Sequence, residues 1–207
     1  RICGSNGAVK NEHRSGQNMV TIGIAMLQGA RHAHIDAIHR AASEMSLDVE
    51  IVELRTIEDL QQHPIDALML PGGESTVMRL RGNDETSQLL PALFEWMRED
   101  RERPVLATCA GAILLADPQD GGLPLVDADI NRNAYGGQVD SFESALDCGF
   151  PGIFIRAPRF GEVRDEVLCT LSGEVVGVRK GNRFALTFHP ELSEDSRYHR
   201  MLLEACA

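Results

Sequence analysis

The sequence lacks the long hydrophobic run that a membrane-spanning helix needs. Such a helix takes about 20 consecutive apolar residues, and no stretch of the chain approaches that length. Positive charge is also scarce, because 20 Lys and Arg residues against 31 Asp and Glu residues give a formal net charge of −11. An acidic chain binds nucleic acid and anionic membranes poorly, so we expect neither as a partner. The charge leaves a neutral small molecule open as a substrate.

Cysteine patterns typical of a metal site are missing as well. The five cysteines are scattered, without the CxxC or Cys/His spacing that binds zinc. They are typical of free thiols in a reducing compartment, so we expect a cytoplasmic protein. His32, His34 and His39 lie close together, but their spacing does not place all three on one helix face. We therefore expect no metal site.

The length and composition suit a single domain. The chain has 207 residues, 43% of them hydrophobic, which is enough for a sizeable core. No repeat, low-complexity block or linker divides it. Residues 1–18 are polar and rich in Gly and Asn, and we expect a disordered extension or a cloning remnant there, with no signal peptide. The folded domain is expected at 19–207.

The order of the predicted elements indicates the fold class. Strands are expected in the first half at 20–27, 48–54, 65–70 and 105–108. Helices are expected between them at 31–45, 57–62 and 89–99. Short strands are expected in the second half at 129–142, 153–155, 163–170, 174–179 and 183–188. A helix over 193–205, with Ser193 as its N-cap, closes the chain. We expect a three-layer α/β fold: a flavodoxin-like, open, mostly parallel sheet with helices on both faces and an antiparallel strand extension.

Cys109 is the most informative residue. It ends the apolar run 104–108 and begins a run of small and aliphatic residues typical of a helix. A sharp strand-to-helix turn of this kind is a nucleophile elbow, where the helix N-terminus stabilises a thiolate and offers backbone N–H groups to an oxyanion. Taken alone, the cysteine is as well explained as a buried core residue.

A base and an orienting group follow downstream. His189 comes directly after the apolar run 184–188, and Glu191 is two residues further on. If Pro190 keeps this segment extended, His189 and Glu191 point to the same side and touch. Cys109, His189 and Glu191 then supply the nucleophile, base and orienter of a catalytic triad. A lone His-x-Glu sequence is more often a core histidine beside a solvated acid.

A glycine turn supplies the third part of the pattern. Pro71-Gly72-Gly73 ends another strand-like run, and such a turn exposes backbone N–H groups as an oxyanion hole requires. Turns use glycine pairs constantly, so this signal is weak by itself. In an open α/β sheet, however, the carboxyl ends of the strands form one crevice. We expect the thiol, the His-x-Glu pair and the glycine turn to meet there.

These residues resemble a known family. Cys109-Ala110-Gly111 and His189-Pro190-Glu191 are similar to the triad segments of class I (triad-type) glutamine amidotransferases. One branch, the glutaminase subunit of pyridoxal 5′-phosphate synthase, is resembled more closely, from about Val20 to the C-terminus. The segments that carry this closer resemblance are 71–76, 108–111, 132–143, 154–158 and 187–192.

The resemblance implies a reaction and a binding site. Glutamine is hydrolysed to glutamate and ammonia through a γ-glutamyl thioester on Cys109, and we place the oxyanion hole at the N–H groups of Gly73 and Ala110. Contacts to the ends of glutamine fall to Gly73, Glu74, Ser75, Arg132, Ile155 and Arg156. Glu74 suits an ammonium and an arginine suits a carboxylate, although most surface arginines are simply solvated.

The resemblance also implies a partner. The ammonia passes to a synthase subunit that builds pyridoxal 5′-phosphate from a pentose phosphate and a triose phosphate, in an assembly of twelve copies of each subunit. Pyridoxal 5′-phosphate is then a product, and no cofactor is expected on this chain. One departure concerns docking, because Gly137 stands where the family usually has an arginine.

Two other interpretations stay open. A triad amidotransferase with a different acceptor, or a γ-glutamyl hydrolase acting on folate tails, would keep the Cys-His-Glu residues and bind other substrates. A non-enzymatic, flavodoxin-like stress or chaperone protein would account for a reactive elbow cysteine. It would not need a His-Pro-Glu sequence at a strand end.

Overall fold

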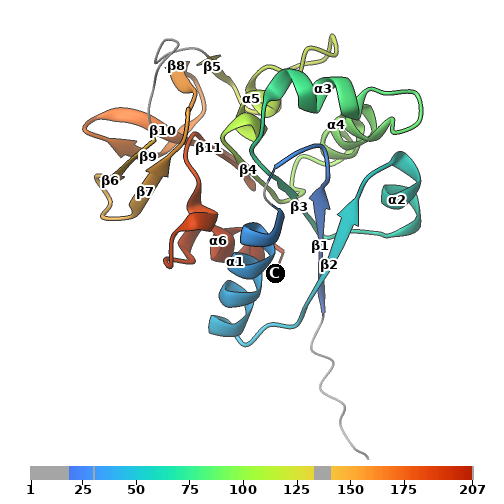
Figure 1. The fold of residues 1–207 in the computed structure, drawn as a ribbon, viewed down its shortest axis with the longest axis horizontal. Coiled ribbons are helices and arrows are strands. Elements are labelled where there is room, and N and C mark those ends of the chain that lie inside the picture. Colours follow the sequence, from blue (N-terminus) through green and yellow to red (C-terminus); the bar gives the residue numbers. More distant parts are fainter. Residues whose placement is uncertain (1–18, 30, 133–140, 207) are drawn as a thin grey trace, which may run out of the picture.

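A seven-stranded sheet forms the centre of the fold (Figure 1). The computed structural model describes residues 19–29, 31–132 and 141–206. The strands of this sheet are β1 (Val20–Ala25), β2 (Val49–Leu54), β3 (Ala67–Leu70), β4 (Val105–Thr108), β9 (Glu166–Leu171), β10 (Glu174–Lys180) and β11 (Arg183–Leu186). Their order is β2-β1-β3-β4-β11-β10-β9. The first five in that order pair in parallel, and β10 pairs antiparallel with both β11 and β9.

Both faces of the sheet are buried. In β3, Leu68 and Leu70 belong to one hydrophobic cluster, whereas Ala67 and Met69 belong to the other. Successive side chains of a strand point to opposite faces, so each face receives every second residue. A strand covered on both sides needs apolar residues throughout, which explains the continuous hydrophobic runs in the sequence.

Helices cover these two faces in separate layers (Figure 1). The helices are α1 (Arg31–Glu44), α2 (Ile57–Gln62), α3 (Ser75–Gly82), α4 (Leu89–Glu99), α5 (Ala110–Ala116) and α6 (Arg197–Glu204). Helices α1 and α6 pack against each other, and α4 contacts α2 and α3 in the opposite layer. The predicted three-layer, mostly parallel fold is therefore confirmed. None of the described helices has the length and apolar character needed to cross a membrane.

The second half contains more strands than the sequence predicted. The strand expected over 163–170 begins three residues later, as β9, and the strand before it, β8 (Arg159–Val163), was not predicted. Arg164 explains the break between β8 and β9, because its backbone N–H and its side chain both donate to Asp127, which turns the chain away from an extended path. The small paired strands here are β5 (Ala128–Asn131) with β8, and β6 (Phe142–Ala145) with β7 (Pro151–Phe154).

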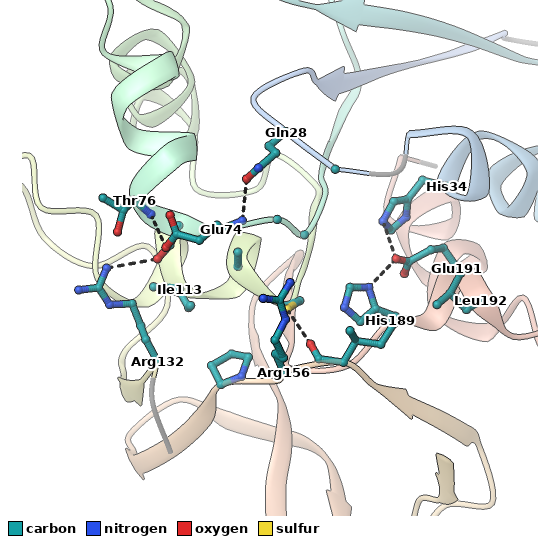
Figure 2. Close-up of a pocket in the computed structure, with 18 residues that line it drawn as sticks. Gln28, His34, Glu74, Thr76, Ile113, Arg132, Arg156, His189, Glu191 and Leu192 are labelled. Atoms are coloured by element: carbon teal, nitrogen blue, oxygen red, sulfur yellow. Dashed lines mark hydrogen bonds and ion pairs between the residues drawn. The ribbon is translucent and has the colours of Figure 1, made fainter. Parts of the chain in front are cut away.

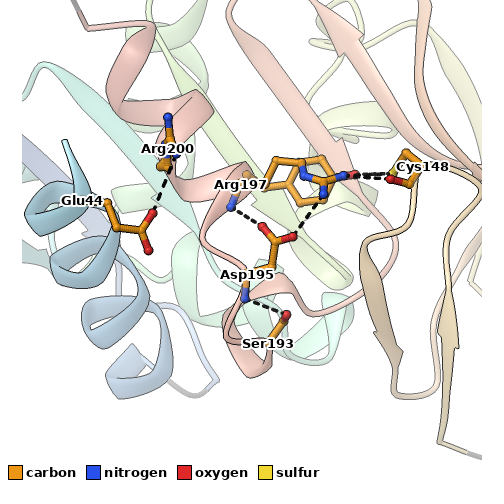
Figure 3. Close-up of polar contacts among 7 residues, drawn as sticks. Glu44, Cys148, Ser193, Asp195, Arg197 and Arg200 are labelled. Carbon is orange, nitrogen blue, oxygen red and sulfur yellow. Dashed lines mark hydrogen bonds and ion pairs between the residues drawn. The ribbon is translucent and has the colours of Figure 1, made fainter.

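The last helix begins later than predicted. Its N-cap is Ser196, and Ser193 instead ends a short 3-10 helix, η2 (Pro190–Leu192), by donating its N–H to Pro190. Figure 3 shows the contacts that set the start of α6: Ser193 accepts from the N–H of Asp195, and Asp195 accepts from Arg197. Asp195, which lies within the predicted helix, therefore precedes the observed one.

Several sequence features lie outside the described residues. These are the expected extension at 1–18, Ala30, and the stretch 133–140 that contains Gly137. Helix α3 was not expected from the sequence, which gave Glu74 and Ser75 only as contacts to glutamine. The Glu74 carboxylate caps this helix by accepting from the N–H groups of Thr76 and Val77.

Gly111 provides a test of how closely α5 approaches β3. A Cβ built on Gly111 would lie 2.3 Å from the Leu70 carbonyl oxygen, so one of the two backbones would have to move. We expect Gly111→Ala to lower the free energy of unfolding by about 3 kcal/mol, measured by urea denaturation. Gly173→Ala is the control, because Gly173 has open space and a φ of +82°, which leaves only backbone strain of about 1 kcal/mol. Equal losses in the two variants would contradict the close approach.

Candidate active site

Cys109 occupies a strained turn between β4 and α5. Its φ is 49° and its ψ is −112°, a conformation that residues with side chains rarely adopt. The N–H of Cys109 donates to Leu186 of the neighbouring strand β11 over 2.8 Å. Ala110 begins α5, so its N–H has no partner within the helix. Backbone strain of this kind is common at functional sites. Because the turn directly follows β4, the Cys109 side chain lies at the edge of the sheet.

His189 and Glu191 form a direct contact. His189 Nδ1 lies 2.7 Å from Glu191 Oε1 (Figure 2). A carboxylate can only accept, so Nδ1 carries the hydrogen and Nε2 is the basic nitrogen. The contact was expected from an extended His-Pro-Glu segment, but the backbone differs. Glu191 lies within the 3-10 helix η2, and this turn brings it to His189.

Three adjacent strand ends bring the glycine turn, the thiol and the imidazole together. A Cβ built on Gly72, after β3, would lie 3.2 Å from Cys109 Cβ and 3.0 Å from His189 Cε1. The Cys109 Sγ–H donates to the carbonyl oxygen of Ile155 over 3.9 Å. Strands β3, β4 and β11 are neighbours in the sheet, so this crevice lies at its carboxyl edge, as expected.

The local electrostatics favour a protonated imidazole. Burial lowers the pKa of His189, but its interactions with Cys109 and Glu191 are stronger together and raise the pKa to about 10. Burial raises the pKa of Glu191, yet the hydrogen bond from His189 and the electrostatic interactions with His34 and His189 bring the pKa below its ordinary value. An ionised Glu191 beside a protonated His189 is the resting arrangement that follows. An imidazolium of this kind is chemically able to donate a proton.

A cavity of about 590 Å³ opens in front of these side chains. Its volume suits a small polar ligand. Every site residue expected from the sequence lines it. These residues are Gly73, Glu74, Ser75, Cys109, Ala110, Arg132, Ile155, Arg156, His189 and Glu191. Their proximity is a finding, whereas the role assigned to each stays a prediction.

The expected binding residues have partners of their own around this cavity. Glu74 accepts from the N–H groups of Thr76 and Val77 at 3.1 and 2.8 Å, and these bonds lower the pKa of its carboxyl group. Arg132 Nη1 donates to Ser75 Oγ over 3.2 Å. Figure 2 shows the guanidinium of Arg132 beside the start of α3. One side of the cavity thus presents a carboxylate next to a cation.

Two further residues at this site had no assigned role in the sequence prediction. Gln28, in the turn after β1, accepts from the N–H of Glu74 over 2.7 Å. His34 is buried, with Nε2 at 3.4 Å from Glu191 Oε1. The sequence prediction considered His34 only as a metal ligand. Its helical spacing to the apolar residues Ala37 and Ile38 was the available signal that it faces the interior.

Known proteins are similar in sequence to most of this chain. The model of the SNO glutamine amidotransferase family matches residues 24–207. The pyridoxal 5′-phosphate synthase subunit PdxT of Thermococcus onnurineus is 42% identical, over 89% of this chain and 98% of its own. PdxT of Methanothermobacter thermautotrophicus is 40% identical, over 90% and 96% of the two chains. PdxT of Haemophilus ducreyi is 42% identical, over 88% and 95%.

Solved structures show the same likeness. A crystal structure of a glutamine amidotransferase superposes with a TM-score of 0.72 at 35% identity, covering 89% of this chain and 98% of that one. A glutamine amidotransferase from Thermotoga maritima gives a TM-score of 0.55 at 15% identity, covering 90% of each chain. This second likeness is one of fold alone.

The pKa of His189 should depend on the Cys109 sulfur. Cys109→Ala removes one of the interactions that raise this pKa, so we expect a lower value in NMR titrations of the imidazole. The raised pKa also means that protonated His189 stabilises the fold. That contribution is complete below the ordinary value of 6.5 and is lost as the pH rises toward about 10. Cys206→Ala, whose thiol bonds Leu202 at the other end of α6, is the control. An unchanged pKa in Cys109→Ala would refute the coupling.

Proposed function

This chain belongs to the SNO glutamine amidotransferase family, and we propose that it hydrolyses L-glutamine to L-glutamate and ammonia with Cys109, His189 and Glu191. The observation that carries the proposal is the 2.7 Å contact between His189 and Glu191, at the strand end beside the Cys109 elbow. The ammonia passes to a synthase subunit that makes pyridoxal 5′-phosphate.

The mechanism begins with attack of the Cys109 thiolate on the side-chain amide carbon of glutamine. Backbone N–H groups of Gly73 and Ala110 stabilise the oxyanion. The C–N bond then breaks, and protonated His189 gives its proton to the leaving nitrogen, which departs as ammonia. Water, deprotonated by the now neutral His189, hydrolyses the γ-glutamyl thioester, and the Cys109 thiolate leaves beside the protonated imidazole, as at the start. Glu191 keeps the imidazole in the tautomer that these steps need.

Glutamine binding uses the charged side of the cavity. The Glu74 carboxylate has lone pairs beyond the two that cap α3, so it can also accept from the ammonium of the substrate. Arg132 or Arg156 donates to the substrate carboxylate. Ser75 and the backbone of Gly73 and Ile155 complete the contacts. Support comes from the position of all six residues on the lining of one cavity.

The partner follows from the chemistry of the product and from the relatives. Ammonia is mostly ammonium near neutral pH and then is no nucleophile, so a dry path to an acceptor preserves its reactivity. The relatives at about 40% identity are named as subunits of pyridoxal 5′-phosphate synthase. We propose an assembly of twelve copies of each subunit. A reducing cytoplasm suits the mechanism, because the nucleophile must remain a free thiol.

Variants of the three triad residues should differ in severity. Cys109→Ala is expected to abolish glutamine hydrolysis, a loss of several orders of magnitude, because no nucleophile remains. His189→Asn should be nearly as severe, whereas Glu191→Gln should retain measurable activity because it only misorients the base. Ammonia release by the purified complex measures all three. Near-native release by Cys109→Ala would refute the mechanism.

Synthase docking should raise the glutaminase rate. The Gly72-Gly73 peptide can change orientation at little cost, so we expect docking to complete the oxyanion hole. One oxyanion donor is worth about 10²–10³ in rate, and stimulation of that order is expected. Glutamate release is compared for this chain alone and with saturating synthase, at one glutamine concentration. Full activity without the partner would favour an enzyme with a different acceptor, such as a γ-glutamyl hydrolase.

A further inference from the structure

Two buried histidines lie behind the proposed triad, and the steps above do not use them. His34 of α1 is 1% exposed and His199 of α6 is 0% exposed. His34 Nδ1 lies 3.2 Å from His199 Nε2. On the other side of the ring, His34 Nε2 lies 3.4 Å from both Glu191 Oε1 and Thr108 Oγ1. Figure 2 shows His34 and His189 on either side of the Glu191 carboxylate.

Hydrogen-bonding capacity assigns the tautomers of both rings. Glu191 is an acceptor only, so His34 Nε2 must carry the hydrogen that faces it. The Nδ1 atom of a neutral His34 is then an acceptor, and His199 Nε2–H donates to it. This leaves His199 Nδ1 as a bare acceptor, and that atom is buried without a hydrogen bond among the described residues. In the opposite tautomer, a lone pair of His34 Nε2 would face a lone pair of Glu191 Oε1, and the two would repel each other.

We propose that His34 is a positioning residue for the glutamine hydrolysis proposed above: its Nε2–H donates to Glu191 and keeps that carboxylate directed at His189, while His199 fixes the His34 tautomer. The inference rests on the proposed function for its reaction, and on the contacts of Glu191 for its geometry. Thr108, whose hydroxyl faces the same Nε2 atom, immediately precedes Cys109. His34 therefore contacts both the strand that presents the nucleophile and the carboxylate that orients the base.

Glu191 has few other partners. Its Oε1 atom faces both His189 and His34, whereas Oε2 is buried and has no hydrogen bond among the described residues. A buried carboxylate with one donor is poorly stabilised as an anion. Loss of His34 would leave the carboxylate free to rotate away from His189 or to take up a proton. Either change lowers the basicity of His189 and disorders its ring.

The charges around the two rings are consistent with a neutral donor. Glu191, His189 and His199 face His34, and Arg40 adds a cation near His199. Burial lowers the pKa of His34, opposed by Glu191 and assisted by His189. Burial also lowers the pKa of His199, to about 3. A neutral His34 supports the Glu191 anion without placing a second cation beside His189.

The contact between α1 and α6 gives both rings fixed positions. Arg40 of α1 donates to Ser196 Oγ over 3.1 Å and to the Ser193 carbonyl oxygen over 2.7 Å. About one turn further along α1, Glu44 accepts from the same Ser196 Oγ over 3.0 Å. Figure 3 shows Glu44 beside Arg200, also on α6. These bonds orient α6 as it begins, three residues before His199.

Two amide variants separate the two sides of the His34 ring. His34→Gln places its side-chain amide near the position of Nε2 and so keeps a donor to Glu191. His34→Asn places its amide near the position of Nδ1 and keeps only the contact with His199. In the complex with the synthase subunit, we expect His34→Asn to lower kcat about 10- to 100-fold with KM for glutamine nearly unchanged. His34→Gln should recover most of kcat. NMR titration should show a lowered His189 pKa in His34→Asn alone.

His39→Asn is the matched control, because His39 lies on the exposed face of the same helix and should change neither kcat nor the His189 pKa. Equal kcat and equal His189 pKa in the Asn and Gln variants would overturn the proposal and leave His34 a packing residue. Reduced thermal stability of both variants with normal kcat would do the same. An unmodified complex that releases no ammonia would refute the proposed function instead, while the His189 pKa would still decide whether His34 orients Glu191.

Discussion

Close backbone contact at the carboxyl edge of the sheet is the constraint on which this site depends. A Cβ on Gly29 would lie 2.2 Å from the carbonyl oxygen of Gly72, and one on Gly111 would lie 2.3 Å from that of Leu70. No side chain fits at either position without moving a backbone. The turns after β1 and β3 and the helix after β4 can therefore meet within one crevice. The Cys109 elbow is formed by the same contact, since α5 must start against the end of β3 to turn the chain so sharply.

Burial and charge oppose each other within this crevice, and pairing decides the result. Burial alone would make both His189 and Glu191 neutral. Because each is the partner of the other, and Cys109 lies beside His189, the pair is ionised instead. His34 and His199 are buried more completely and have no such balance of charges, and they remain neutral. Histidine is therefore protonated at position 189 and neutral at positions 34 and 199, because the neighbouring groups differ.

Sequence patterns predicted most of the fold because local rules apply to it directly. The bounds of α2, α4 and β4 agree with the prediction, since each has a clear apolar period and a breaking residue at its ends. The failures come from side chains acting on backbone. Arg164 divides β8 from β9 by donating to Asp127, Glu74 caps a helix that has little apolar periodicity, and Asp195 delays the start of α6. Hydrophobic periodicity in the sequence does not predict contacts of this kind.

The meeting of Gly73, Cys109 and His189 was predicted because strand ends in a parallel sheet meet at one edge. The other residues around the cavity were expected from the family resemblance alone, and the second contacts of the proposed triad were not predicted. The His189–Glu191 contact was expected for a reason that proved wrong, since a 3-10 turn and not an extended segment brings the carboxylate to the ring. His34 was compared only with the other histidines in sequence, and the test of a shared helix face did not ask what one buried ring would touch. Its partners come from η2, β4 and α6, distant in sequence.

The two sides of the crevice differ in how they are restrained. The triad side rests on α1 and α6, where the partners of His189 and Glu191 are buried and where Arg40 and Glu44 bond the start of α6. The opposite side consists of turns, in which Gln28 bonds the N–H of Glu74 and Arg132 bonds Ser75. Bonds of this second kind join exposed or half-buried groups that water can replace at little cost. An event at the surface can therefore alter the turn that carries Gly73 while leaving His189 and Glu191 in place, so the proposed oxyanion contact is easier to control than the position of the proposed base.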